Sequence, residues 1–164
     1  MRDITILYVT ANELPQKWMD FQIGHLLQAA QGAEIISLSR KPMNLGTNVL
    51  DGDEKSYWNI YSCMLRGALL AKTPYVAMAE DDVLYTEAHF NEYRPKDDAV
   101  AYDRSRWSLF TWEKMPMYCL RQRLSNCSLI APRDLLIQKI TERQQKWPQG
   151  APHHLVGEVG REKI

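Results

Sequence analysis

The stretch Tyr75-Val76-Ala77-Met78-Ala79-Glu80-Asp81-Asp82 passes from apolar to acidic residues with no break. Its first five residues follow Thr73-Pro74 as a short apolar run, which is typical of a parallel strand buried on both faces. The acidic triplet then stands at the carboxyl end of the strand, where ligands bind in open parallel sheets. Three adjacent carboxyl groups repel one another and are stabilised by a cation or by hydroxyl groups. The stretch therefore predicts an α/β sheet with a ligand site at the end of this strand.

Strands and helices alternate in the sequence before this stretch. The β-branched run at 4–10 and the shorter apolar run at 35–38 predict strands. Helical spacing of apolar residues predicts helices over 15–30 and 55–72, and a high density of turn-forming residues predicts a long loop over 40–54. This order is typical of a parallel sheet with right-handed crossovers.

The second half of the chain predicts a less regular arrangement. The connections between its apolar segments are too short for crossover helices, so we expect the sheet to become mixed. The expected elements are strands at 99–102, 107–112, 118–120 and 128–131, a helix over 133–145, and an irregular tail from Trp147.

Composition excludes several classes of protein. The 164 residues include 20 Lys and Arg and 20 Asp and Glu, and 45% of them are hydrophobic, which is typical of a globular chain and not of a disordered one. The net charge of zero gives no overall attraction to nucleic acid or to an anionic membrane. No apolar run is long enough to form a membrane span, and the first residues lack the features of a signal peptide. The three cysteines form no CxxC pair, so we expect a cytoplasmic protein without a disulfide framework.

A strand that ends in Glu80-Asp81-Asp82 after a strand-helix-strand-helix beginning resembles the family 2-like nucleotide-sugar glycosyltransferases of the GT-A fold, whose acidic signature is written DxD, EDD or xDD. The turn Thr10-Ala11-Asn12 and the segment 129–136 are also similar to this family, and the resemblance covers residues 3–145. It implies a Rossmann-like GT-A fold: α/β, with a mostly parallel central sheet, helices on both faces and a mixed second half. It also implies one glycosyltransferase-like domain over 1–164, minimal or truncated, with a nucleotide-sugar-binding half at 1–85 and an acceptor half at 86–164.

The resemblance assigns roles to the acidic triplet. It implies that Asp82 binds a divalent metal, Mn²⁺ or Mg²⁺, which bridges the diphosphate of a nucleoside-diphosphate sugar donor. Asp81 would lie near the ribose or the donor sugar, and Glu80 would face the nucleotide. Oxygen ligands suit both metals, and a metal neutralises the charge that builds on the departing nucleoside diphosphate. Some enzymes of this kind add a C-terminal histidine to the metal, which makes His154 a candidate ligand, with an exposed histidine as the alternative.

Polar residues after the first two strands are further candidates for the donor site. Thr10, Ala11 and Asn12 follow the first strand, where Asn12 would read the base or the ribose or, alternatively, cap the next helix. Arg40 and Lys41 follow the second strand, where they would pair with the diphosphate or remain solvated.

An inverting enzyme of this family needs a carboxylate that acts as general base on the attacking hydroxyl. Glu113, after an expected strand, is the first candidate, and Glu158 in the tail is the second. Both have plain surface residues as the alternative, and a retaining reaction needs no such base.

Three other functions stay open from the sequence alone. A nucleotidyltransferase or a phosphohydrolase would also use carboxylates and Mg²⁺ at strand ends. A non-catalytic module that binds a nucleotide or a protein would retain the acids for contact alone. The acceptor of a transferase would be a glycan, a small molecule or a modified base in DNA, and the arginines of the second half leave room for a local basic face.

Overall fold

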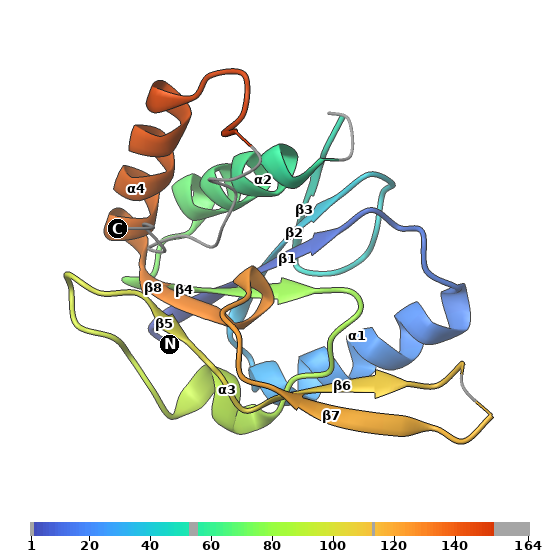
Figure 1. Ribbon diagram of the computed structural model, residues 1–164. Coiled ribbons are helices and arrows are strands. Elements are labelled where there is room, and N and C mark those ends of the chain that lie inside the picture. Colours follow the sequence, from blue (N-terminus) through green and yellow to red (C-terminus); the bar gives the residue numbers. More distant parts are fainter. Residues whose placement is uncertain (1, 53–55, 113, 153–164) are drawn as a thin grey trace.

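The computed structural model describes residues 2–52, 56–112 and 114–152, which form a central sheet between two layers of helices and a separate hairpin (Figure 1). The elements in chain order are β1 Ile4–Thr10, α1 Gln16–Ala30, β2 Glu34–Ser39, β3 Thr47–Leu50, α2 Tyr57–Leu70, β4 Tyr75–Glu80, α3 Glu87–Asn91, β5 Ala101–Tyr102, β6 Arg106–Phe110, β7 Met117–Arg121, the 3₁₀ turn η1 Asn126–Ser128, β8 Leu129–Pro132 and α4 Arg133–Lys146. Among the described residues, no helix has the length and apolar character that a membrane crossing requires.

Six strands form the central sheet in the order β3-β2-β1-β4-β8-β5. The first four strands are parallel to one another, whereas β8 is antiparallel to β4 and β5 is antiparallel to β8. The chain is therefore α/β with a mostly parallel sheet, and the predicted change to a mixed sheet is confirmed. β1 lies between β2 and β4, so the strand order reverses there, and the carboxyl ends of all four parallel strands meet at one edge.

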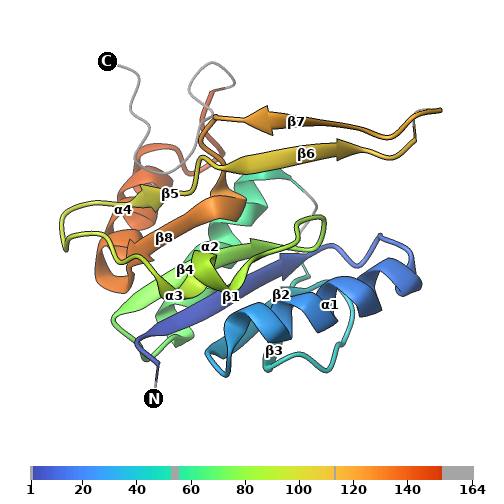
Figure 2. The same cartoon turned by 90° about the horizontal axis from the view of Figure 1, so that it is seen from below.

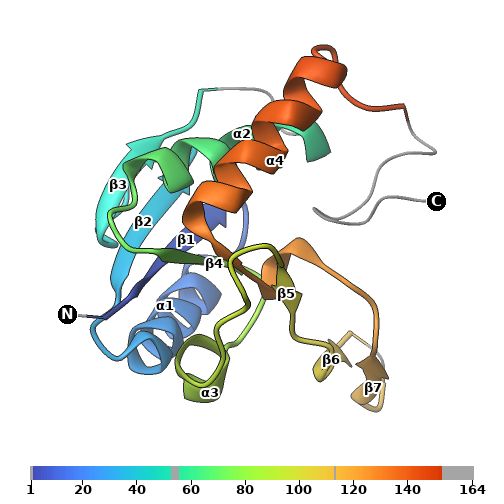
Figure 3. The same cartoon turned by 90° about the vertical axis from the view of Figure 1, so that its left-hand side faces the viewer.

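Helices cover both faces of the sheet, as Figure 3 shows. On one face α1 and α3 pack over a core that includes Ile6 and Leu26, and on the other α2 and α4 pack over a core that includes Leu7 and Met64. Successive side chains of a strand point to opposite faces, so the neighbours Ile6 and Leu7 belong to different layers. Burial on both faces explains why β1 is a continuous apolar run.

The prediction of a loop over 40–54 is wrong in part, because β3 occupies four of these residues at the edge of the sheet. β3 pairs with β2 in parallel register, with Thr47 opposite Ile36. Gly46 makes the tight entry into β3 possible: its φ is +58°, and a Cβ atom there would lie 2.0 Å from the carbonyl oxygen of Ile35. The turn-forming residues therefore mark a tight turn into a short strand.

Among the described residues, β6 and β7 pair only with each other, in a two-stranded antiparallel sheet. The strands expected at 107–112 and 118–120 are present with shifted ends, and Trp112 lies beyond the end of β6. Figure 1 and Figure 2 show the hairpin extending away from the body of the protein. Since β8 is antiparallel to both β4 and β5, strands β4 and β5 run in the same direction. The end of β5, which leads into the hairpin, and the start of β8, which follows it, therefore lie on the side of the sheet where β4 ends.

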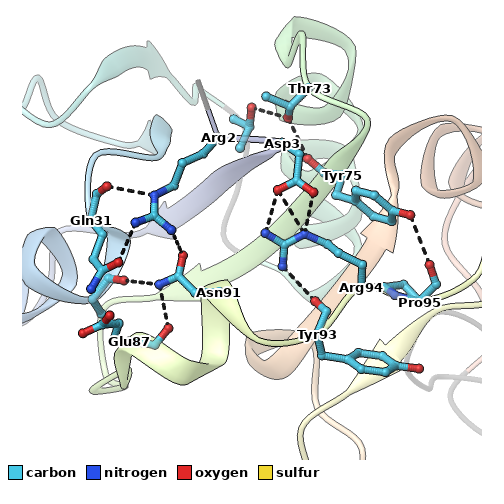
Figure 4. A network of polar contacts seen from close by, with 12 residues as sticks. Arg2, Asp3, Gln31, Thr73, Tyr75, Glu87, Asn91, Tyr93, Arg94 and Pro95 are labelled. Carbon is cyan, nitrogen blue, oxygen red and sulfur yellow. Dashed lines mark hydrogen bonds and ion pairs between the residues drawn. The ribbon is translucent and has the colours of Figure 1, made fainter.

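A network of polar contacts lies at the amino ends of the parallel strands, on the side of the sheet opposite to the end of β4 (Figure 4). The Arg94 guanidinium donates from Nη2 to Asp3 Oδ1 at 2.8 Å and lies over the ring of Tyr75. Arg2 donates to the side-chain oxygen of Asn91. The network ties the residues before the first strand to the end of α3 and to the segment that follows it.

Candidate functional site

A cleft of about 660 Å³ lies at the edge of the sheet where the parallel strands end. It is bounded by the residues that follow the parallel strands, by the loop that leads into α1 and by the first half of α2. The lining residues are Val9, Thr10, Ala11, Glu13, Leu14, Arg40, Asp51, Ser56, Tyr57, Asn59, Ile60, Cys63, Glu80, Asp81 and Asp82. All of them precede residue 85, so the described cleft belongs to the half of the chain that was expected to bind the nucleotide sugar.

The backbone of the acidic turn is fixed by α1. The side-chain amide of Gln22, a buried residue, donates to the carbonyl oxygens of Glu80 at 3.3 Å and Val83 at 3.0 Å. The indole N–H of Trp18 donates to the carbonyl oxygen of Asp81 at 2.8 Å. These bonds satisfy backbone acceptors that would otherwise need water or a ligand. The conformation of the turn is therefore set by the protein itself.

The three acidic side chains have different surroundings. The hydroxyl of Thr10, which is nearly buried, donates to Asp81 Oδ2 at 2.5 Å and accepts the backbone N–H of Asn12 at 2.9 Å. Glu80 is the last residue of β4 and is half-buried. The Asp82 side chain is exposed, and no hydrogen-bond donor of the described residues holds its carboxylate. Asp82 is thus the most accessible of the three to a ligand in the cleft.

Tyr85 connects the acidic turn to the second half of the chain. Its buried hydroxyl accepts the backbone N–H of Glu80 and donates to the carbonyl oxygen of Cys127, both at 2.9 Å. Burial raises the pKa of Tyr85 well above its usual value, and the neighbouring Cys127, Glu80 and Asp82 reinforce the shift. The phenol therefore stays protonated and keeps its donor at neutral pH.

Tyr8 supports the turn from β1 in the same way. Its hydroxyl donates to Gln22 Oε1 at 3.0 Å, which orients the Gln22 amide group toward the turn. Burial raises the pKa of Tyr8, and the carboxylates of Asp81 and Asp82 raise it further. The hydroxyl is therefore a permanent donor at neutral pH.

A further carboxylate lines the cleft, and the sequence analysis did not single it out. Asp51 is the first residue after β3 and is 7% exposed. Two side chains of α2 hold it: Arg66 Nη2 donates to Asp51 Oδ1 at 2.5 Å, and Asn59 Nδ2 donates to Asp51 Oδ2 at 2.5 Å. The available signal was its position at the carboxyl end of a strand, but that signal depends on recognising β3.

The donor set of the cleft fits a hard divalent cation that is shared with a ligand. Among the described residues, no three His, Cys, Asp or Glu side chains form a complete metal site. Mg²⁺ is commonly bound by one or two carboxylates together with waters and substrate phosphates, and does not require a full protein cage. Asp82, with its exposed carboxylate, and the neighbouring Asp81 supply such a partial set of oxygen ligands. The residues present therefore fit a metal that a phosphate ligand also binds.

The structure brings Thr10, Ala11, Arg40 and the acidic triplet together around the cleft, as the sequence led us to expect. Asn12 and Lys41 do not line it. The backbone N–H of Lys41 donates to Asn12 Oδ1 at 2.9 Å, and Lys41 Nζ donates to the Asn12 carbonyl oxygen at 3.4 Å. The alternative role of Asn12 as a helix cap is wrong, because the N-cap of α1 is Pro15. Asn12 instead ties the loop after β1 to the segment after β2.

The other three candidate residues are Glu113, Glu158 and His154. All of them lie outside the described residues. The roles of general base and metal ligand that the sequence analysis gave them stay predictions.

Comparison with known proteins supports the fold. No protein-family model and no curated protein matches the chain. Among solved structures, the chain is similar to the bifunctional IspDF from Campylobacter jejuni, with a TM-score of 0.52 and 13% sequence identity. The match covers 85% of this chain and 43% of the IspDF chain, so this chain spans less than half of that protein. At this identity the likeness shows the fold alone, an α/β fold with a mostly parallel central sheet and flanking helices.

Proposed function

We propose that this chain is a metal-dependent glycosyltransferase that moves a sugar from a nucleoside-diphosphate sugar to a hydroxyl acceptor, on the GT-A form of the α/β fold. The observation that carries the proposal is the acidic turn Glu80-Asp81-Asp82, which borders a cleft of about 660 Å³ where the strand order reverses. Ligands of open α/β sheets bind at such a position. The volume of the cleft is also within the range of sites that bind small organic ligands.

We assign each side chain of the cleft a separate role in binding the donor. Asp82 would hold Mn²⁺ or Mg²⁺, and Asp81, whose carboxylate is fixed by the Thr10 hydroxyl, would contact the donor. The metal supplies Lewis-acid stabilisation of the departing nucleoside diphosphate. Arg40 lines the same cleft and adds positive charge for the phosphates. Asp51, with both oxygens bonded by α2 side chains, presents a fixed acceptor in the cleft wall.

The loop after β1 favours this function over nucleotidyl transfer. A nucleotidyltransferase usually carries a glycine-rich, basic loop after its first strand, because backbone N–H groups and cations there cradle a triphosphate. The corresponding residues, Thr10-Ala11-Asn12-Glu13-Leu14-Pro15, contain neither glycine nor a basic residue. The leaving phosphates would instead be stabilised by the metal bound at the acidic turn and by Arg40.

The first test is calorimetric binding of uridine diphosphate and guanosine diphosphate, each with and without Mn²⁺. We expect one of the two nucleotides to bind and to require the metal. Asp82→Asn should lower the affinity by about tenfold or more, because it replaces the most accessible oxygen ligand by a neutral group. Asp98→Asn, a matched change at an exposed position outside the cleft, should leave the affinity unchanged.

Turnover separates the transferase from the competing functions. Metal-dependent release of the nucleoside diphosphate from a nucleotide sugar, lost in Asp82→Asn, is the expected result. Release of pyrophosphate from a nucleoside triphosphate would instead identify a nucleotidyltransferase. Nucleotide binding without any turnover would identify a binding module, and a folded protein that binds neither nucleotide would contradict the proposal.

A further inference from the structure

The hairpin of β6 and β7 carries an unusual concentration of exposed apolar side chains. Among the described residues, large apolar side chains are exposed at fourteen positions, and half of these positions lie in the short segment 107–120. The hairpin members are Trp107, Leu109, Trp112, Met115, Met117, Tyr118 and Leu120. Exposed apolar groups scattered singly need no explanation, but a contiguous patch marks a site of interaction.

The register of the hairpin places four of these side chains on one face. Trp107 is opposite Leu120 and Leu109 is opposite Tyr118, and directly opposed residues of an antiparallel pair point to the same side. The rings of Trp107 and Tyr118 lie 5.5 Å apart. At the tip, Trp112 and Met115 are 73% and 78% exposed. The apolar surface therefore runs from the outer face of the hairpin to its tip.

The segment that carries this apolar surface is also rich in cations. The segment 104–123 contains five basic residues and one acidic residue, in a chain whose net charge is zero; they are Arg104, Arg106, Lys114, Arg121, Arg123 and Glu113. Arg106 and Arg121 are directly opposed on the other face of the hairpin, where Arg106 Nη1 donates to Cys127 Sγ at 2.9 Å and Arg121 Nε donates to Ser108 Oγ at 3.2 Å. Among the described residues, none of the five cations forms an ion pair with a carboxylate. Arg104, Lys114 and Arg123 are exposed, so the described part of the hairpin offers positive charge to an anionic partner.

We propose that the β6–β7 hairpin docks the protein on an anionic lipid surface, with Trp112 and Met115 in the interface and the exposed cations Arg104, Lys114 and Arg123 at the phosphate groups. Trp and Tyr favour the membrane interface, because one part of each ring system is apolar and another part is polar. Arg side chains extend along apolar surface while the guanidinium stays with the headgroups. Both ends of the hairpin join the sheet at the edge that carries the cleft, so docking holds the cleft near the lipid.

Two other partners fit the hairpin less well. A second copy of the chain would bring two basic hairpins together, and their like charges would repel. Single-stranded nucleic acid would be bound by aromatic stacking, but Leu109, Met115, Met117 and Leu120 present no flat ring to a base. An anionic lipid surface satisfies both the aliphatic and the cationic side chains.

The test is co-sedimentation of the full chain with vesicles of phosphatidylcholine, with and without phosphatidylglycerol. We expect stronger binding to the vesicles that contain phosphatidylglycerol, and weaker binding as salt screens the charges. Trp112→Ser with Met115→Ser should lower the partition coefficient by about tenfold or more, because two exposed apolar side chains no longer enter the interface. Arg104→Gln with Arg123→Gln should reduce binding to the level of the neutral vesicles.

The control is Leu27→Gln with Leu69→Gln, which removes two exposed apolar side chains from α1 and α2. It should bind vesicles as the wild type does. Equal loss in the control, or no binding to anionic vesicles at low salt, would overturn the proposal. Hairpin-dependent binding of a single-stranded oligonucleotide without vesicle binding, or hairpin-dependent dimerisation in sedimentation velocity, would also overturn it in favour of those partners. Vesicle binding needs no turnover, so its outcome is independent of the proposed transfer reaction.

Discussion

Thr10→Val is the substitution that best tests how the acidic turn is held. Valine has nearly the shape of threonine and replaces the hydroxyl by a methyl group, which can neither donate nor accept a hydrogen bond. The lost hydrogen bond joins Thr10 to the Asp81 carboxylate at 2.5 Å, and the backbone N–H of Asn12 loses its acceptor as well. A hydrogen bond to a charged group contributes about 1.5–3 kcal/mol, and the half-buried Asp81 places this bond in the lower part of that range. With the Asn12 amide included, we expect the free energy of unfolding to fall by about 2–3 kcal/mol.

Thr5→Val is the matched control on the same strand. Thr5 is buried at the amino end of β1, and its hydroxyl donates to Glu34 Oε2 at 2.8 Å and shares a hydrogen bond with Thr73 Oγ1 at 2.8 Å. Its loss should lower the free energy of unfolding by about the same amount, measured by chemical denaturation. Because Thr5 lies at the edge opposite the cleft, metal-dependent nucleotide binding should be unchanged. Thr10→Val should weaken that binding by about tenfold or more, which corresponds to about 1.4 kcal/mol of lost orientation at Asp81.

The comparison of the two variants decides whether the reasoning holds. If Thr10→Val destabilises the fold but binds the nucleotide as tightly as the wild type, the orientation of Asp81 does not matter for binding. If both variants lose binding equally, general destabilisation explains the loss. Either result would refute the role assigned to the Thr10 hydroxyl.

Three other measurements test the structure away from this contact. Gly46→Ala should lower the free energy of unfolding by more than about 3 kcal/mol, because the new Cβ would meet a backbone oxygen in a left-handed conformation. Gly24→Ala in α1 should stabilise the fold by up to about 1 kcal/mol, because no other atom of the described residues lies within 4 Å of the added Cβ; urea denaturation compares the two variants. The hydrogen bonds from Arg94 lower the pKa of Asp3 in the folded chain. Asp3→Asn should therefore lower the free energy of unfolding by under about 1 kcal/mol at pH 7. The difference in stability between the wild type and the variant should vanish as the pH falls through the folded pKa of Asp3, measured by urea denaturation at several pH values. Burial raises the pKa of Cys63 to about 11, so iodoacetamide at pH 8 should modify this thiol slowly in the folded chain and quickly in urea. Mass spectrometry measures the labelling, and fast modification of Cys63 in the folded chain would contradict its burial.

The elements that could be predicted from the sequence are those whose environment leaves one simple pattern. β1 and β4 are covered on both faces, so their sequences are continuous apolar runs. β3 is an edge strand of four residues with exposed or half-buried side chains, and such a strand resembles a loop in composition. Turn-forming residues around it strengthened the wrong assignment. Asp51 was missed for the same reason, because its importance depends on the strand before it.

The hairpin shows a second limit of prediction from the sequence. Trp107, Ser108 and Leu109 alternate as expected for a strand with one buried face. Alternation shows that one face is apolar, but it does not show whether the protein itself covers that face. In the structure the apolar face is exposed and the strands leave the central sheet. Only the three-dimensional arrangement reveals that this surface is available to a partner.

The acidic turn itself is positioned by segments from both halves of the chain, and this has consequences for binding. Its backbone is held by Trp18 and Gln22 of α1, and by Tyr85, which also bonds to Cys127 before β8. A buried polar network of this kind is stable only when its members are satisfied together, so the turn has one arrangement. A ligand that binds the exposed Asp82 carboxylate then incurs little ordering cost, because the turn is already in place. Asp82→Asn should therefore reduce nucleotide binding with little effect on stability, whereas Thr10→Val should reduce both.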